Sequence, residues 1–207
     1  MESKQEPKPY SSDKLFYLVI AVFLVSILVY AGIMYFSPKE PAPERITYNE
    51  FTFVKQGGLW YTNWQKEDKV FILSLRYNPK EAEQVSILGR IDKNSTFDNR
   101  DVIYITFDPL GNDLSHIALA ATELSLNLKR ALDVNVKAAC IVNETLACKD
   151  RPIITCDDTD KAVIFLKEDP ESDMILTDNC VTLQGDGMEI MRVVDRILYI
   201  WYGIMAR

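Results

Sequence analysis

The sequence predicts a mixed α+β fold, in which one N-terminal transmembrane helix precedes a single domain that combines a β-meander with a mixed sheet packed by two helices. Three observations predict this fold. Residues 15–36 form an apolar run with no charged residue and no proline. Short runs rich in β-branched and aromatic residues follow it, separated by turn-forming residues. Two longer stretches, residues 113–132 and 187–205, repeat apolar residues at helical spacing.

The apolar run, "LFYLVIAVFLVSILVYAGIMYF", has the length of a membrane span. As a helix its 22 residues would extend roughly 33 Å, compared with about 30 Å for the hydrocarbon core of a bilayer. A soluble amphipathic helix would carry a polar stripe, which this run lacks. A cleaved signal normally has an apolar stretch of only about 7 to 15 residues before a small-residue cleavage site. We therefore expect an uncleaved signal anchor, with a cleaved signal as the alternative.

Basic residues on either side of the run favour a cytoplasmic N-terminus. Three lysines precede the run, and two basic residues follow it at Lys39 and Arg45. The side with more Lys and Arg normally stays inside, so this small bias predicts a single pass through the cell membrane with the N-terminus cytoplasmic.

Four segments follow from that orientation. We expect a cytoplasmic tail, the transmembrane signal anchor, a Pro-rich stalk and an extracytoplasmic α+β domain, at residues 1–14, 15–36, 37–45 and 46–207. All four cysteines and both Asn-x-Ser/Thr sequons, at Asn94 and Asn143, lie in the last segment. An even number of cysteines and loop-placed sequons are typical of an oxidising compartment, and the two asparagines are candidate glycosylation sites.

The net charge limits the choice of partners. The formal charge of −7 belongs to the part beyond the apolar run, because the first 14 residues hold three lysines and three acidic residues. A nucleic-acid partner would need a basic face, so we expect none. The membrane is the expected environment of the anchor, and a protein partner or self-association is expected for the domain.

The domain begins with a predicted three-stranded meander. Gly57-Gly58 separates two runs rich in β-branched and aromatic residues, which indicates a two-residue hairpin. The next run, from Val70, places alternate large apolar residues on one face. Asn78-Pro79 is expected to begin a short helical turn, followed by a strand near residues 85–88 and an exposed loop that contains the first sequon.

A β-α-β unit is expected next. Residues 102–107, "VIYITF", are apolar on both faces, as in a strand covered on two sides. The stretch 113–132 follows as a helix that Asp113 can cap, and residues 134–141 read as a strand. This order favours a parallel pair of strands joined by a helical crossover.

Three further strands and a last helix complete the predicted fold. The strands are expected at residues 152–156, 162–166 and 174–183. In the helix at 187–205 we expect an apolar stripe that includes Trp201, opposite a polar stripe that includes Asp195 and Arg196.

The four cysteines favour disulfides over a metal site. They contain no Cys-x-x-Cys pair, and the chain has one histidine, so zinc has few soft ligands. Three pairings are open. We favour Cys140 with Cys148 and Cys156 with Cys180, because each bond closes a local loop between neighbouring strands.

Two other candidate sites are explained by ordinary structural roles. The segment "CDDTD" from Cys156 clusters three carboxylates, but it lacks the glycine and the closing Glu of a calcium loop, so we expect a solvated turn. Ser115 and His116 are adjacent on a helix and point about 100° apart, which disfavours a nucleophile and base pair. We expect no catalytic, cofactor or metal residues.

Three tryptophans are candidate partner contacts. Trp60 and Trp64 share one face of a predicted strand, and Trp201 lies on the last helix. Aromatic side chains often anchor interfaces, although core packing is the simpler reading for all three.

The order of several motifs resembles that of a group of uncharacterised single-pass archaeal membrane proteins with a cysteine-containing ectodomain. The motifs are an N-terminal span, "GGLWYTNW", "YITFDP", cysteine-bearing strands and a closing "VDRILYIWYGIM". They extend over nearly the whole chain. The resemblance implies no activity and no functional residues.

The sequence thus favours a membrane-anchored extracytoplasmic binding or assembly module that acts through protein contacts. An anchor, a stalk and a disulfide-linked domain are all indicated, whereas no constellation of acid, base, nucleophile or metal ligands is evident. The alternatives are a membrane-tethered ectoenzyme, such as a hydrolase whose carboxylates converge only in the fold, and a small-ligand sensor.

Overall fold

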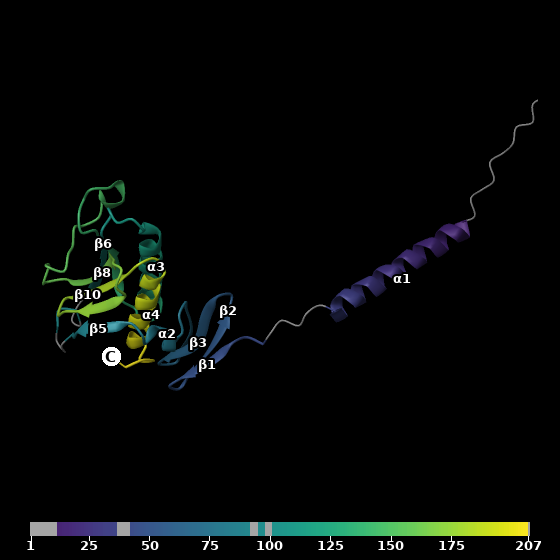
Figure 1. Cartoon of the computed structure of the whole chain (residues 1–207), viewed down its shortest axis with the longest axis horizontal. Coiled ribbons are helices and arrows are strands. Elements are labelled where there is room, and N and C mark those ends of the chain that lie inside the picture. Colours follow the sequence, from purple (N-terminus) through teal and green to yellow (C-terminus); the bar gives the residue numbers. More distant parts are fainter. Residues whose placement is uncertain (1–11, 37–41, 92–94, 98–100, 207) are drawn as a thin grey trace, which may run out of the picture. The chain divides into compact units, whose positions relative to one another are not determined.

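The computed structural model describes residues 12–36, 42–91, 95–97 and 101–206 (Figure 1). The chain divides into two compact units, Met1–Ala42 and Pro43–Arg207. The first contains the helix α1, Ser12–Phe36, whose stretch Lys14–Phe36 is long and apolar enough to cross a membrane. Most of the expected tail and stalk, and the sequon asparagine Asn94, lie outside the described residues.

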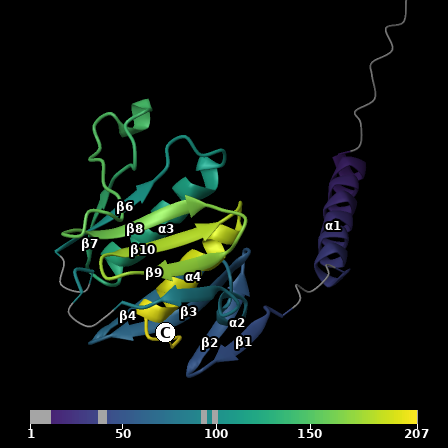
Figure 2. The same cartoon turned by 60° about the vertical axis from the view of Figure 1, so that its left-hand side comes forward.

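A four-stranded antiparallel meander opens the second unit (Figure 2). Its strands, paired in chain order, are β1 Arg45–Tyr48, β2 Phe51–Gln56, β3 Leu59–Lys66 and β4 Lys69–Leu75. Three strands were expected. The additional strand β1 begins at Arg45, the last residue of the expected stalk, and is too short for its alternation to be recognised in the sequence. Gly57 and Gly58 have φ values of 58° and 81°, as the predicted tight hairpin requires.

The predicted helical turn after the meander is confirmed as α2, Pro79–Ala82. Asn78 caps it: its side chain accepts from the backbone N–H groups of Lys80 and Glu81, while the Glu81 carboxylate accepts from the N–H of Asn78 at 2.8 Å. Such a reciprocal capping box satisfies donors that a helix start otherwise leaves unpaired.

A six-stranded mixed sheet forms the rest of the unit, in the order β5-β9-β10-β8-β6-β7. Its strands are β5 Ser86–Gly89, β6 Val102–Phe107, β7 Asn135–Ala138, β8 Ala162–Glu168, β9 Asp173–Leu176 and β10 Cys180–Gly185. The helix α3, Leu114–Arg130, joins β6 to the parallel strand β7, which confirms the predicted β-α-β unit. Asp113 caps α3, as expected.

Two strand predictions were wrong. Residues 152–156 form no strand, and only an isolated bridge joins Cys140 to Ile153. Proline at 152 cannot donate to a ladder, so the segment stays at the border of the sheet. Residues 174–183 form two antiparallel strands rather than one, because the chain turns at Thr177–Asn179, where the N–H of Thr177 bonds to the carbonyl of Cys180.

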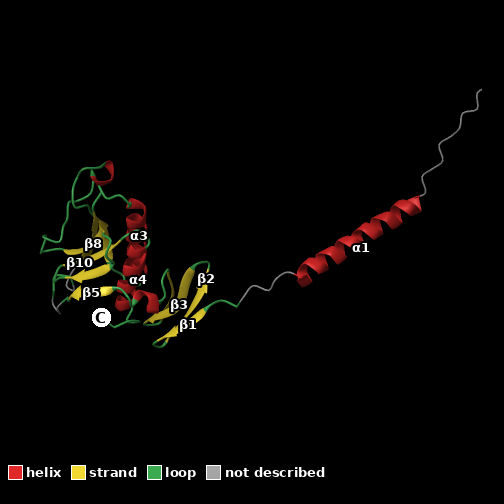
Figure 3. Cartoon of the chain, viewed as in Figure 1, coloured by secondary structure: helices red, strands yellow, loops and turns green. Residues whose placement is uncertain are grey.

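The last helix, α4 Glu189–Trp201, is enclosed on two sides (Figure 3). It packs against β10 of the mixed sheet and lies beside α3, while the meander covers its other side. Trp64 and Phe53 of the meander contact Tyr202 and Tyr199, with ring centroids 4.8 Å and 5.7 Å apart. Part of the polar stripe expected in α4 is therefore covered: Asp195 and Arg196 are both buried, whereas Glu189 and Arg192 are partly exposed.

Candidate functional site

A buried carboxylate lies where the meander meets α4. Asp195 is fully buried, and its Oδ2 accepts the backbone N–H groups of Arg76 at 2.9 Å and Tyr77 at 2.7 Å. These residues directly follow β4. Asp195 therefore holds the end of the meander on α4, because its carboxylate accepts hydrogen bonds from two backbone N–H groups of that segment.

Glu123 of α3 joins Asp195 to form a carboxyl pair. Burial raises the pKa of both groups, and the charge of Glu123 raises the pKa of Asp195 further. Glu123 Oε1 and Asp195 Oδ1 are both buried and have no hydrogen-bond partner among the described residues. Burial and the neighbouring carboxyl group thus disfavour the charged form of Asp195, because a negative charge is unfavourable in a desolvated site beside another.

Arg76 covers the pair on the solvent side. Its Nε lies 3.5 Å from Glu123 Oε2, and its charge opposes the rise in the pKa of Glu123. The side chains of Arg76 and Glu123 are partly exposed, whereas Asp195 has no access to solvent. A ligand can therefore contact Glu123 directly. Asp195 can influence such a ligand only through its interaction with Glu123.

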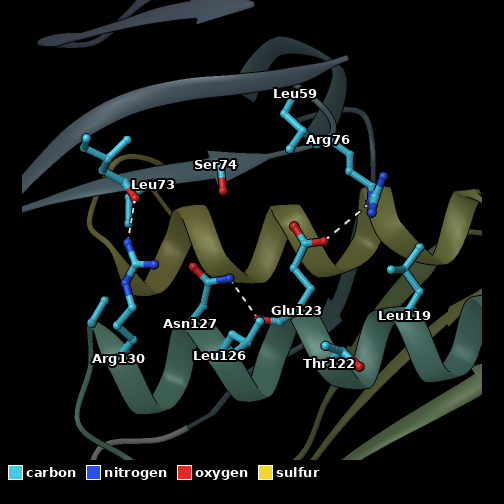
Figure 4. Close-up of a pocket in the computed structure, with 12 residues that line it drawn as sticks. Leu59, Leu73, Ser74, Arg76, Leu119, Thr122, Glu123, Leu126, Asn127 and Arg130 are labelled. Atoms are coloured by element: carbon cyan, nitrogen blue, oxygen red, sulfur yellow. Dashed lines mark hydrogen bonds and ion pairs between the residues drawn. The ribbon is translucent and has the colours of Figure 1, made fainter. Parts of the chain in front are cut away.

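Glu123 and Arg76 also line an open slot between β4 and α3 (Figure 4). We call it the β4–α3 slot; its volume is about 250 Å³. Its lining comes from the meander and from α3: Leu59, Ile72, Leu73, Ser74 and Arg76, and Leu119, Thr122, Glu123, Leu126, Asn127, Arg130 and Ala131. Ile72 and Leu126 are 59% and 62% exposed, so apolar surface flanks the slot on both sides.

Polar side chains of α3 project towards β4 inside the slot (Figure 4). Arg130 Nη2 donates to the backbone carbonyl of Ile72 at 3.1 Å. Asn127 Nδ2 donates to the carbonyl of Glu123, and its Oδ1 accepts the hydroxyl of Tyr202 at 2.6 Å. The slot thus combines apolar rims with an oriented set of donors and acceptors.

The sequence analysis missed Glu123 and Asp195. Asp195 was assigned to the polar stripe of the last helix, and Glu123 was not singled out within the helix expected at residues 113–132. One signal in the sequence could have indicated that Asp195 is buried: most residues of α4 near it are apolar.

Two of the tryptophan candidates are corrected. Trp60 and Trp64 are only 2% and 9% exposed and belong to the core, so neither can contact a partner in this conformation. Trp64 Nε1 donates to the backbone carbonyl of Tyr202 at 2.8 Å. Burial removes the large apolar area of the indole from water, and this hydrogen bond satisfies its single donor. Trp201 is half-buried and stacks on Phe97, with ring centroids 6.2 Å apart.

The cysteines form the two disulfides favoured from the sequence. Cys140 is bonded to Cys148 and Cys156 to Cys180, with Cα separations of 6.0 Å and 5.3 Å. The second sequon asparagine, Asn143, is exposed in the loop closed by the first disulfide.

The segment "CDDTD" forms a turn with its own partners. Asp158 accepts the backbone N–H of Thr155 at 2.8 Å, and Lys161 lies 3.0 Å from Asp160. Among the described residues no three His, Cys, Asp or Glu side chains are grouped to hold a metal ion.

Ser115 and His116 do not pair with each other. Both bind Asp113: Ser115 Oγ donates to Oδ1 at 2.7 Å, and His116 Nδ1 lies 2.5 Å from Oδ2. These hydrogen bonds, that of Ser115 above all, lower the pKa of Asp113. Ser115 therefore lacks the base that a catalytic serine needs.

A second hollow, of about 700 Å³, lies where β6 and β8 end. Ligands of open α/β sheets often bind at such carboxyl ends. Here the backbone N–H groups of Asn112 and Asp113 donate to Glu168, and Lys167 pairs with Asp169 at 2.6 Å. The polar groups of this hollow thus largely satisfy one another.

No protein-family model, no curated protein and no solved structure matches this chain. The resemblance to archaeal membrane proteins therefore stays a prediction.

Proposed function

We propose that the protein is a membrane-anchored module that binds another protein through the β4–α3 slot. The observation that carries this proposal is the slot itself, which is open, flanked by exposed Ile72 and Leu126, and oriented by Arg130. Exposed apolar side chains around a hollow with a few fixed polar groups are typical of interaction sites.

The anchor and the disulfides support display outside the cell. The structure combines one apolar helix able to span a membrane with two disulfides, which indicates a membrane-anchored protein with an oxidised domain. We propose in addition that the N-terminus is cytoplasmic, and that Asn94 and Asn143 are available for glycosylation. Protease added to intact cells should then remove the domain, whereas full protection would reverse the orientation.

Photo-cross-linking tests the binding function. A photoreactive residue at Leu126 lies beside the slot, and one at Leu146, on the short helix Leu146–Cys148, is a control at an exposed apolar position elsewhere. In native membranes the Leu126 variant should give a discrete protein adduct and the Leu146 variant should not. Absence of adducts at both positions would contradict the proposal.

A carboxylate-based ectoenzyme is the second candidate, and one observation favours it. The carboxyl groups of Glu123 on α3 and Asp195 on α4 are neighbours, and Glu123 lines the open slot. Carboxyl groups with raised pKa values serve as general acids in hydrolases. The full chain would then hydrolyse a member of a panel of glycosides, esters and phosphate esters, and Glu123→Gln would abolish that turnover without unfolding the domain.

A further inference from the structure

The outer edge of β4 has unpaired backbone groups. β4 is an edge strand, paired only with β3, and the register joins Lys66 to Lys69 across a two-residue turn. In such a hairpin the flanking residues exchange both hydrogen bonds, and the pattern then alternates. The N–H and C=O groups of Val70, Ile72 and Ser74 therefore point away from β3, towards the slot.

Side chains satisfy only part of this edge. Arg130 donates to the carbonyl of Ile72, at a position where the N–H of a fifth strand would donate. Asp195 accepts the N–H of Arg76, the next outward group along the edge. Among the described residues, the outward N–H groups of Ile72 and Ser74 have no hydrogen-bond partner.

The edge also lacks the usual protection against strand addition. Natural edge strands are commonly short or carry charges and proline along the exposed stretch. β4 has seven residues, and after Lys69 it contains neither a charged residue nor a proline; the side chains of Val70 and Ile72 are 64% and 59% exposed. By contrast, β1 at the other edge of the meander has four residues.

The meander covers α4 but stops short of α3, which lies beside α4 (Figures 2 and 4). A strand added to β4 would therefore lie over the outer face of α3. There it would cover Leu126 and fill the slot, as an extended peptide does when it binds between a sheet edge and a helix.

We propose that the β4–α3 slot binds an extended peptide segment of a partner protein as a fifth strand of the meander, with an acidic side chain of that segment paired with Arg130. This proposal rests on the proposed binding function and specifies how the partner segment binds. Among the described residues Arg130 has no carboxylate partner, whereas its neighbour Arg76 is paired with Glu123. A guanidinium that lacks a carboxylate partner, in a protein of net charge −7, favours an acidic side chain on the peptide.

A second copy of this chain is a poorer occupant. If two β4 edges paired across a two-fold axis, each copy would bring its own α3 to the same junction. Two helices would then occupy the space beside the joined edges. A single extended segment has no such helix, so it fits the space that one α3 leaves open.

A displayed library of random peptides, selected against the full chain in nanodiscs, tests the proposal. The informative variant is Ser74→Pro, because proline removes an outward N–H that the ladder with β3 does not use. Its matched control is Ser74→Ala, which keeps the N–H. Selected peptides should be rich in Asp or Glu and bind Ser74→Ala normally, but bind Ser74→Pro and Arg130→Gln about tenfold more weakly.

Amide hydrogen exchange gives a readout that requires no variant. On addition of a selected peptide, the amides of Val70, Ile72 and Ser74 should become protected, whereas those of Phe71 and Leu73 already bond to β3 and should change little. This alternation is specific to strand addition, because a peptide docked only through side chains would not produce it.

The opposing results are distinct. Strand addition would be overturned by selected peptides that bind Ser74→Pro as well as they bind the parent. It would also be overturned if a bound peptide protected the amides of β4 without the alternating pattern. Failure to select any peptide, or spontaneous disulfide-linked dimers of a Val70→Cys variant in native membranes, would also overturn it, the latter in favour of a second copy. Adducts at Leu126 together with unaltered binding by Ser74→Pro would leave the binding function standing and refute only its mode.

Discussion

Asp195, in the middle of α4, accepts a hydrogen bond of 2.7 Å from the backbone N–H of Tyr77, 118 residues earlier in the chain. With the neighbouring bond from Arg76, this contact holds the end of the meander against the helical layer. It also brings the unpaired edge of β4 beside α3. The buried carboxylate of Asp195 is therefore one of the contacts that position the proposed binding site.

Loss of this acceptor should destabilise the protein strongly. Asp195→Ala leaves two buried N–H groups unsatisfied, and we expect a loss of about 3 kcal/mol or more in the free energy of unfolding. Asp195→Asn keeps an acceptor and can donate to Glu123, so it should cost less than half as much. Urea unfolding of the full chain in detergent, followed by tryptophan fluorescence, measures both. Equal losses in the two variants would contradict the assigned role.

Stability should fall as the pH rises above the acidic range. Because burial raises the pKa values of Glu123 and Asp195, the folded state binds more protons than the unfolded state at a pH above their ordinary values of 4.5 and 3.8. Their contribution is thus fully present at low pH and is lost as the pH rises through the raised values. Glu123→Gln should flatten this fall at pH values above the ordinary carboxyl range, because the variant has no proton to lose there. Glu144→Gln, at an exposed position, is the control and should leave the slope unchanged.

The tryptophans should differ in their effect on stability. Trp64→Ala removes a buried indole and its hydrogen bond to Tyr202, so we expect a loss of about 3 to 5 kcal/mol. Trp201 is half-buried, so Trp201→Ala should cost clearly less. Thermal unfolding of the two variants tests this order. If Trp201→Ala folds normally but loses a co-purifying protein, Trp201 belongs to an interface as well.

The two disulfides should have the connectivity seen in the structure, and each should stabilise the folded protein. Mass spectrometry of non-reduced peptides should find Cys140 linked to Cys148 and Cys156 linked to Cys180. Replacement of the second pair by serine should cost roughly 3.5 kcal/mol, and replacement of the first roughly 2.5 kcal/mol, because the longer loop restricts the unfolded chain more. Free thiols at all four positions would also undo the argument for an oxidising compartment.

Local patterns in the sequence determined much of the architecture. The apolar run predicted α1, Gly57-Gly58 predicted the hairpin, and Asn78-Pro79 predicted the capped turn. The β-α-β unit around α3 followed from the change between strand and helix periodicity. These features depend on backbone preferences and side-chain spacing over a few neighbouring residues, which a single sequence displays directly.

Only the tertiary structure decided which of these surfaces are buried and which are open. Asp195 lies on the polar stripe that the sequence predicts for its helix, yet the meander covers it there. Trp60 and Trp64 became core for the same reason, whereas the edge of β4 stayed open because the meander ends before α3. Burial depends on elements far apart in the chain, so the pairing of Glu123 with Asp195 and the unpaired edge arise only when the layers are assembled.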